Sequence, residues 1–279
     1  MSFSSYSALL CVGNEDKPEW LSVALDSMLG QTVKPDEIVL VQNGSLVDDL
    51  DATIYRYKKD YPEIFKILSL PDKVGVGMAL QQGVLACSHG FIACMDADGY
   101  SVPNRIEEEF KALLENKVDM VGSVVDEFVD STDNVVAHRT FPEDPEQIYR
   151  CAKRKIPMAH SSILIKKRMV LACGNYEDFY LAEDYSLFIR LLSICAKGYN
   201  IQKPLVYKRV REDFYEQRRG WDYFRAMIRF NKKFFKTKWF SYRDYVVRSV
   251  VNCEESFMRP IVKRCFANKS FSRRGLYDF

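Results

Sequence analysis

The chain contains 279 residues, of which 47% are hydrophobic and 28% are charged, and this composition excludes fibrous and intrinsically disordered proteins. Its length allows one large domain, or one domain with a smaller appendage. The net charge of +2 is unevenly spread, because residues 201–279 carry 20 Lys and Arg against 8 Asp and Glu, whereas residues 1–200 carry 20 against 30. The basic last quarter predicts contact with an anionic partner.

The start of the chain and its cysteines predict a cytoplasmic protein. The N-terminus lacks the basic start and long apolar core of a signal peptide, and the chain has no apolar run of about 18 residues that would span a membrane. The eight cysteines include no C-x-x-C pair, which is typical of free thiols in a reducing compartment.

Strand and helix patterns alternate along the first half of the chain. This alternation predicts an α/β fold whose mostly parallel sheet is flanked by helices. The expected strands are 7–12, 37–41, 65–70, 91–95 and 120–125, and the expected helices are 18–29, 49–61, 74–87 and 103–115.

The second half is less regular. Residues 126–160 are rich in charge and proline, which favours loops that cover a site. A short strand is expected at 162–165, an amphipathic helix at 182–196 and a strand at 200–208, and from Arg218 onwards the pattern is helical, basic and aromatic.

Polar residues follow several of the predicted strands. Asn14 and Glu15 come after the first strand, Asn43 after the second, and Asp96 and Asp98 after the fourth. Ligands of parallel α/β sheets bind beyond the carboxyl ends of the strands. We therefore expect these side chains to converge on one edge of the sheet.

Asp96 and Asp98 are the candidate metal ligands. Alternation in an extended chain places them on the same face, where two carboxylates repel unless a cation lies between them. Oxygen ligands in an open site suit Mg2+ or Mn2+, with water and substrate phosphates completing the coordination. A D-x-D sequence alone is usually a solvated turn, but here it directly follows the apolar strand FIACM.

Two other segments have both a structural and a functional interpretation. Glu183 and Asp184 open a helix, where acids interact favourably with the macrodipole, but one of them could also act as a general base. His160 lies among small polar residues and is either structural or part of a site. Gly75 and Gly77 precede a helix without the remaining residues of a phosphate-binding fingerprint, which indicates a tight turn.

The order of these segments resembles glycosyltransferase family 2, whose members have the GT-A fold. The resemblance covers residues 6 to about 225. It is carried, in chain order, by Asn14-Glu15, Ser27–Thr32 (SMLGQT) with Pro35–Ile38 (PDEI), Gly75–Leu80 (GVGMAL), Met95–Asp98 (MDAD), Ala159-His160 with Gly174–Tyr176 (GNY), Glu183–Leu187 (EDYSL) and Arg218–Gly220 (RRG).

The resemblance implies inverting transfer of a hexose from a nucleotide sugar, most often UDP-linked, to a glycan or lipid-linked acceptor in surface or capsular polysaccharide synthesis. It implies a GT-A catalytic domain over 1–215, with a nucleotide-sugar-binding half (1–125) and an acceptor-side half (126–215), followed by a helical region (216–279). Asp98 would coordinate the metal and Asp96 would support the metal or the ribose. Asp184 would be the base, with Glu183 as its neighbour.

The resemblance also assigns the remaining candidate residues. Asn14, Glu15 and Asn43 would contact the nucleotide sugar, and Asn43 stands where the family usually has an Asp that pairs with the nucleobase. His160 would belong to the acceptor side. Lys73, Arg218 and Arg219 are candidates for an electrostatic clamp on the departing diphosphate.

The aromatic and basic segment 221–279 has two interpretations. Aromatic rings interleaved with cations suit a helix on an anionic membrane surface, which would make the protein peripheral on the inner face of the cytoplasmic membrane. The segment also suits a helical subdomain. Nucleic acid is not an expected partner, because the acidic first 200 residues offer no matching groove. Two other functions stay open, a nucleotidyltransferase and a non-catalytic nucleotide-sugar-binding module.

Overall fold

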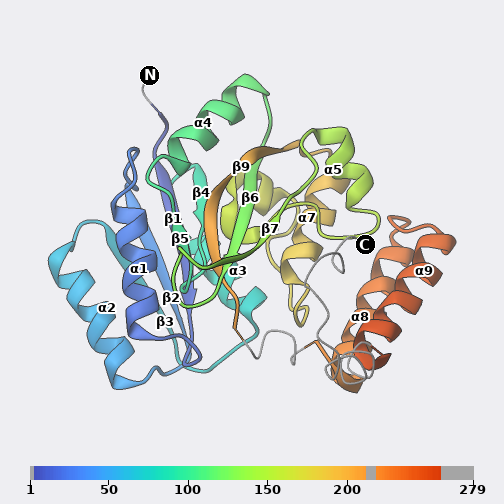
Figure 1. The fold of residues 1–279 in the computed structure, drawn as a ribbon, viewed down its shortest axis with the longest axis horizontal. Helices are drawn as coiled ribbons and strands as arrows, with labels where there is room; N and C mark the ends of the chain where they lie inside the picture. Colours follow the sequence, from blue (N-terminus) through green and yellow to red (C-terminus); the bar gives the residue numbers. More distant parts are fainter. Residues whose placement is uncertain (1–2, 212–217, 259–279) are drawn as a thin grey trace. The chain divides into compact units, whose positions relative to one another are not determined.

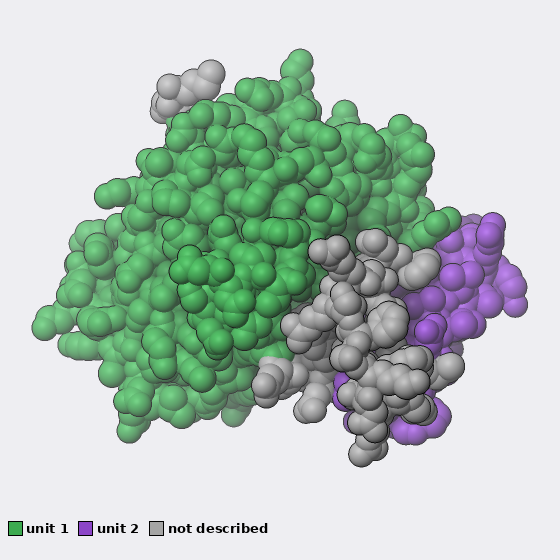
Figure 2. All heavy atoms as spheres, viewed as in Figure 1, with its two compact units in different colours: residues 1–211 green, residues 212–279 purple. Residues whose placement is uncertain are grey.

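The structure is a computed structural model that describes residues 3–211 and 218–258. The chain divides into two compact units, Met1–Arg211 and Glu212–Phe279 (Figure 2). The boundary that we expected, between residues 215 and 216, falls outside the described residues. In the described parts of both units, no helix combines the length and the apolar character needed to cross a membrane.

The first half of unit 1 builds a parallel sheet with the order β3-β2-β1-β4 (Figure 1). Because successive side chains of a strand point to opposite faces, each inner strand buries residues on both sides. The elements are β1 (Tyr6–Val12), α1 (Pro18–Leu29), β2 (Glu37–Asn43), α2 (Asp48–Asp60), β3 (Phe65–Leu70), α3 (Val76–Ala86) and β4 (Phe91–Cys94).

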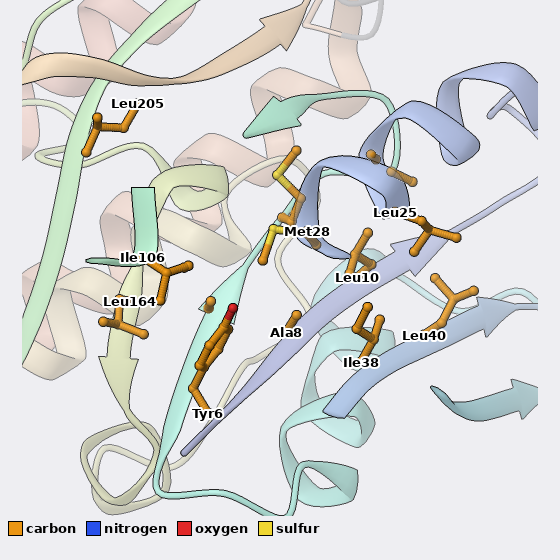
Figure 3. Packing of buried hydrophobic residues seen from close by; sticks show 14 of the residues in the cluster. Tyr6, Ala8, Leu10, Leu25, Met28, Ile38, Leu40, Ile106, Leu164 and Leu205 are labelled. Atoms are coloured by element: carbon orange, nitrogen blue, oxygen red, sulfur yellow. The ribbon is translucent and has the colours of Figure 1, made fainter. Parts of the chain in front are cut away.

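The two faces of this sheet are covered by different helices. Ala8 and Leu10 of β1 face Leu25 and Met28 of α1 (Figure 3). On the other face, Gly83 of α3 lies so close that a Cβ there would be 2.5 Å from Leu9. The expected helices on both faces of the sheet are therefore confirmed.

The sheet continues through the order β4-β8-β6-β9-β5, where parallel and antiparallel pairs mix. Its long pair, β6 with β9, is parallel, so their carboxyl ends meet at one edge. The elements are β5 (Tyr100–Ser101), α4 (Arg105–Glu115), β6 (Met120–Phe128), η1 (His160–Ser162), β8 (Leu164–Lys166), α6 (Lys167–Ala172), α7 (Glu183–Ser193) and β9 (Gly198–Arg209).

The prediction of loops throughout 126–160 was wrong, because this segment contains strand β7 (Val135–Arg139) and helix α5 (Pro145–Cys151). Strand β7 pairs with β6 and carries charges that meet partners across the ladder. Arg139 binds Glu127 through two nitrogens at 2.8 and 2.9 Å. In a sequence, the charged residues of an edge strand look like those of a loop. In the structure, the cross-strand charge pairs stabilise the pairing of β6 with β7.

The family-like segment Ser27–Thr32 (SMLGQT) connects the end of α1 with the start of α4. Gln31 is buried, and its Nε2 donates to the carbonyl oxygens of Ser27 and Val102 at 2.9 and 2.8 Å. Its Oε1 accepts from the backbone N–H of Ile106 at 3.1 Å, which satisfies one of the unpaired donors in the first turn of α4. This signature therefore acts as a long-range helix cap.

A buried ion pair contacts the end of β4, just before the D-x-D segment. Arg105 and Glu109 are fully buried, and Arg105 Nε lies 2.8 Å from Glu109 Oε1. Arg105 also donates to the carbonyl oxygen of Cys94, the last residue of β4, at 3.0 Å. The end of the strand that leads to Asp96 and Asp98 is thus fixed by a guanidinium.

Arg105→Ala is expected to lower the free energy of unfolding by about 3–5 kcal/mol, because it leaves the buried Glu109 carboxyl without its partner. The measurement is chemical denaturation. Lys111→Ala is the matched control, since it breaks an exposed pair with Glu107 on the same helix, and it should leave the unfolding midpoint unchanged. Equal midpoints for both variants would show that the buried pair contributes nothing to stability.

Unit 2 contains α8 (Gly220–Lys236), α9 (Tyr242–Cys253) and the π-helical turn η3 (Glu254–Met258). Helix α9 begins with a capping box between Ser241 and Asp244. Several aromatic residues of the segment that has both a membrane-surface and a subdomain interpretation are buried. These are Tyr223, Phe230, Phe234, Trp239 and Phe240.

Candidate active site

The D-x-D carboxylates directly follow β4 and are paired with two cations. Asp98 is 6% exposed, and its Oδ2 lies 3.1 Å from Arg211 Nε. The Oδ2 of Asp96 lies 3.4 Å from Lys208 Nζ. Burial, and next the charge of Asp96, raise the pKa of Asp98, whereas Lys208 and His160 hold the pKa of Asp96 below its usual range against the effect of burial.

Lys208, near the end of β9, connects this carboxylate pair with the start of α7. The charge of Asp96 raises the pKa of the Lys208 ammonium against the effect of burial, and Asp98 and Asp184 raise it further. Because Coulomb interactions weaken with distance, Lys208 links Asp184 electrostatically to the D-x-D pair.

The loop after β1 lies against this cluster. Arg211 Nη1 donates to the carbonyl oxygen of Glu15 at 3.0 Å and lies 3.4 Å from Asp16 Oδ1. Burial raises the pKa of Asp16 to about 6. Lys73 approaches from the loop after β3, with Nζ 2.9 Å from Glu15 Oε2. Two of the predicted donor-side residues, Glu15 and Lys73, thus meet each other.

The two predicted asparagines also lie at this edge, but their amides bind neighbouring loops. Asn14 exchanges hydrogen bonds with the backbone of Ser45 and Val47, both at 2.8 Å. The buried Asn43 exchanges two hydrogen bonds with the backbone of Val74, both at 2.9 Å. The amide groups that we expected to meet the nucleotide therefore have backbone partners.

Glu183 and Asp184 occupy the first turn of α7. Asp184 Oδ1 accepts from the backbone N–H of Tyr185 at 2.6 Å. Glu183 packs against the glycine turn that begins α3, where a Cβ on Gly77 would lie 2.9 Å from the Cβ of Glu183 and 2.3 Å from the carbonyl oxygen of Glu177. This glycine permits the close approach of α3 and α7.

His160 joins the cluster from the acceptor side. Its Nε2 lies 2.7 Å from the hydroxyl of Tyr176, which in turn lies 3.8 Å from the Cys94 sulfur. Burial lowers the pKa of His160, but Cys94, Asp96 and Asp184 raise it to about 9. A protonated imidazole here interacts electrostatically with Asp96 of the D-x-D pair and with the candidate base Asp184.

Two of the predicted residues lie in the other unit. Arg218 and Arg219 belong to unit 2, so their diphosphate role stays a prediction. Sequence reasoning missed Lys208, Arg211 and Tyr176. The signal for the cations was the basic run Lys208–Arg211 at the end of an apolar strand, and Tyr176 stood in the GNY segment without a role.

The chemistry of the donor set fits a divalent cation that a substrate completes. Within 3–211 and 218–258, no group of three or more His, Cys, Asp or Glu side chains is arranged to hold a metal. Asp96 and Asp98 supply carboxylate oxygens, and Mg2+ typically binds to one or two carboxylates together with substrate phosphates. A cation here would compete with Lys208 and Arg211 for these carboxylates.

Comparison with known proteins identifies the family of this chain. Residues 7–174 match the model of a family described as glycosyl transferase family 2. An uncharacterized glycosyltransferase of Haemophilus influenzae is 31% identical over 77% of this chain and 79% of its own length. The amylovoran biosynthesis glycosyltransferase AmsE of Erwinia amylovora is 30% identical over 80% of this chain and 83% of its own.

Two further similarities cover nearly the whole chain. The UDP-Gal:alpha-D-GlcNAc-diphosphoundecaprenol beta-1,3-galactosyltransferase of Escherichia coli is 28% identical over 97% of this chain and 98% of its own. The structure of Staphylococcus aureus TarS 1–349 in complex with UDP-GlcNAc superposes with a TM-score of 0.68 at 15% identity, covering 96% of this chain and 76% of that one. The second similarity confirms the GT-A-type fold.

Proposed function

This chain belongs to glycosyl transferase family 2, and from that premise we propose that it moves a hexose from a UDP-sugar to a lipid-linked glycan in the synthesis of a surface polysaccharide, with inversion and with Mn2+ or Mg2+. The observation that carries the proposal is the pairing of Asp96 with Lys208 and of Asp98 with Arg211, together with the effect of Asp184 on the charge of Lys208. It combines a candidate metal site and a candidate base at one edge of the sheet. The UDP donor and the diphospholipid acceptor are suggested by the names of the Staphylococcus and Escherichia proteins.

The reaction follows from where charge develops. The bond between the anomeric carbon and the diphosphate oxygen breaks through an oxocarbenium-like state. A divalent cation held by Asp98 and Asp96 would neutralise the charge on the leaving diphosphate. Lys208 and Arg211 hold two further positive charges beside these carboxylates, available to the same diphosphate.

Asp184 completes the reaction as the general base. The acceptor hydroxyl attacks the anomeric carbon from the face opposite the diphosphate, and its proton passes to the Asp184 carboxylate. The new bond joins the acceptor oxygen to the sugar, and the electron pair of the broken bond leaves with UDP.

The direct test is an assay for UDP release with Mn2+, a panel of UDP-hexoses and a diphosphoundecaprenyl-linked N-acetylglucosamine acceptor. The expected result is UDP release that depends on metal and acceptor, with one hexose added to the lipid product. Pyrophosphate release would indicate a nucleotidyltransferase instead. Binding of a UDP-hexose without turnover on this acceptor would favour a non-catalytic module.

We also propose that unit 2 contacts the membrane that carries this acceptor, through α9. This helix exposes Tyr242, Val246, Val247, Val250 and Val251, with exposed fractions from 40% to 72%. An amphipathic helix with an apolar face in a basic region binds anionic lipid surfaces. The contact is thus assigned to the valine face of α9 and not to the aromatic residues buried in the unit.

Val246→Asp combined with Val250→Asp should lower binding to vesicles containing anionic lipid by at least about tenfold, since both exposed valines lose apolar contact with the lipid. Liposome flotation measures the bound fraction. Val136→Asp is the control, because Val136 is an exposed valine in unit 1 with an exposed fraction of 44%, close to the 40% of Val246, and it should not change binding. If wild-type protein does not float with anionic vesicles, the membrane assignment is wrong.

A further inference from the structure

Three loops at the carboxyl edge of the sheet are tied to one another, and an asparagine makes each of the first two connections. These loops are residues 13–17 after β1, 44–47 after β2 and 71–75 after β3, and we call them together the donor-side wall. Asn14, in the first loop, donates from Nδ2 to the carbonyl oxygen of Ser45 and accepts at Oδ1 from the backbone N–H of Val47. This single side chain therefore binds the second loop at two positions, Ser45 and Val47.

Asn43 repeats this arrangement one strand further along the sheet. Its Nδ2 donates to the carbonyl oxygen of Val74, and its Oδ1 accepts from the N–H of the same residue. The side chain is buried, with 4% of the residue exposed. The next residue, Gly44, has φ of +87°, and a Cβ there would lie 2.8 Å from the backbone nitrogen of Lys73. The second and third loops are thus in close backbone contact.

The third loop returns to the first through an ion pair. Lys73 Nζ lies 2.9 Å from Glu15 Oε2, with side chains 63% and 42% exposed. Exposed pairs of this kind contribute little to stability, so the two asparagines are the main connections in the wall. An amide suits both positions, because each asparagine must donate and accept at the same time, and a carboxylate cannot donate.

We propose that Asn14 and Asn43 are positioning residues that preform the donor-side wall and act on the nucleotide through the loops that they hold. Because its amide is buried and bound to Val74 through both groups, Asn43 would act on the nucleobase through the third loop and not by pairing with it. An Asp at position 43 would face the carbonyl oxygen of Val74 with a second acceptor and would release the third loop. The nucleotide part of this inference rests on the proposed function, whereas the loop part does not.

The test uses Asn43→Asp and Asn14→Asp in the full chain. Hydrogen exchange without ligand should become at least about tenfold faster at Val74 in the first variant and at Val47 in the second, because the carboxylate cannot donate to the carbonyl oxygen that it faces and repels it, so the loop that carries the N–H group moves away from its acceptor. Asn116→Asp is the matched control. Asn116 lies at the C-terminal end of α4 and binds only the carbonyl oxygen of Ala112 there, so it should leave exchange in the wall unchanged.

Donor kinetics and nucleotide affinity form the second part of the test. Both wall variants should raise KM for the UDP-sugar by at least about tenfold while kcat changes by less than about threefold, since preorganisation lowers the cost of binding. The ratio of the Kd values for UDP and CDP should stay the same. A changed ratio with unaltered exchange would mean that Asn43 contacts the base, which overturns the proposal.

The exchange measurement separates this inference from the proposed function. If exchange accelerates in the expected loops but the protein binds no UDP, the wall is as we propose and the donor assignment fails. If Asn43→Asp does not fold, Asn14→Asp carries the same test, because Asn14 is exposed and its loss leaves no buried group unsatisfied. Unchanged exchange at Val47 in that variant overturns the proposal.

Discussion

Asp184→Asn is expected to lower kcat about 10²–10⁴-fold, because an amide cannot accept the proton of the acceptor hydroxyl. Affinity for the UDP-sugar should stay within about twofold of wild type, since the change affects the reaction and not the binding of the donor. Steady-state assays of UDP release and calorimetric titration of the donor measure the two quantities. This combination of lost turnover and retained affinity identifies a base.

Asp60→Asn is the matched control for this variant. Asp60 is an exposed residue at the end of α2, and the same change of carboxylate to amide there should leave kcat and affinity unaltered. Turnover above one tenth of the wild-type value in Asp184→Asn would rule out Asp184 as the base. A parallel loss of donor affinity would instead indicate a binding role.

Asp98→Asn is expected to raise the Kd for Mn2+ in the presence of UDP by at least about tenfold and to lower kcat about 10²–10³-fold. The reason is that one anionic ligand is lost where the leaving diphosphate must be neutralised. Electron paramagnetic resonance of bound Mn2+ measures the affinity independently of activity.

The same variant also separates two uses of this carboxylate. Asp98 pairs with Arg211, so the loss of that ion pair could lower thermal stability without any change in metal binding. A lower melting temperature with an unchanged Kd for Mn2+ would assign Asp98 a structural role only. Asp60→Asn again serves as the control for both readouts.

The donor half of the fold could be predicted because its signals are local. Helix α1 has the predicted bounds, with Pro18 at its first position, and β4 runs into the D-x-D segment as expected. What the sequence could not reveal is which contacts these segments make. The signature residue Gln31 caps a helix 75 positions further along the chain, and only the folded topology brings them together.

The cations of the site illustrate the same limit. Lys208 and Arg211 follow an apolar strand, and a basic run at such a place is usually a solvated surface. The strand order β4-β8-β6-β9 and the parallel pairing of β9 with β6 bring them next to Asp96 and Asp98, which follow β4. Their partners, Asp96 and Asp98, lie more than a hundred residues earlier in the chain, so no spacing rule connects them.

The aromatic segment of unit 2 shows why an amphipathic pattern has two meanings. A helix with one apolar face buries it in lipid or against another helix, and the periodicity is the same in both cases. Here Phe230, Phe234 and Phe240 pack against one another within the unit. The exposed apolar residues belong to α9, whose valines gave a weaker signal in the sequence than the aromatic residues of α8.

The measurement that tests the account most directly is a crystal structure of Asp184→Asn with Mn2+ and the UDP-sugar, read from the anomalous signal of manganese. The account predicts a peak bonded to the carboxylate at position 98 and to both phosphates, with the anomeric carbon between that peak and the amide at position 184. A peak elsewhere, or a residue 184 that faces away from the anomeric carbon, would contradict a shared site for cation and base.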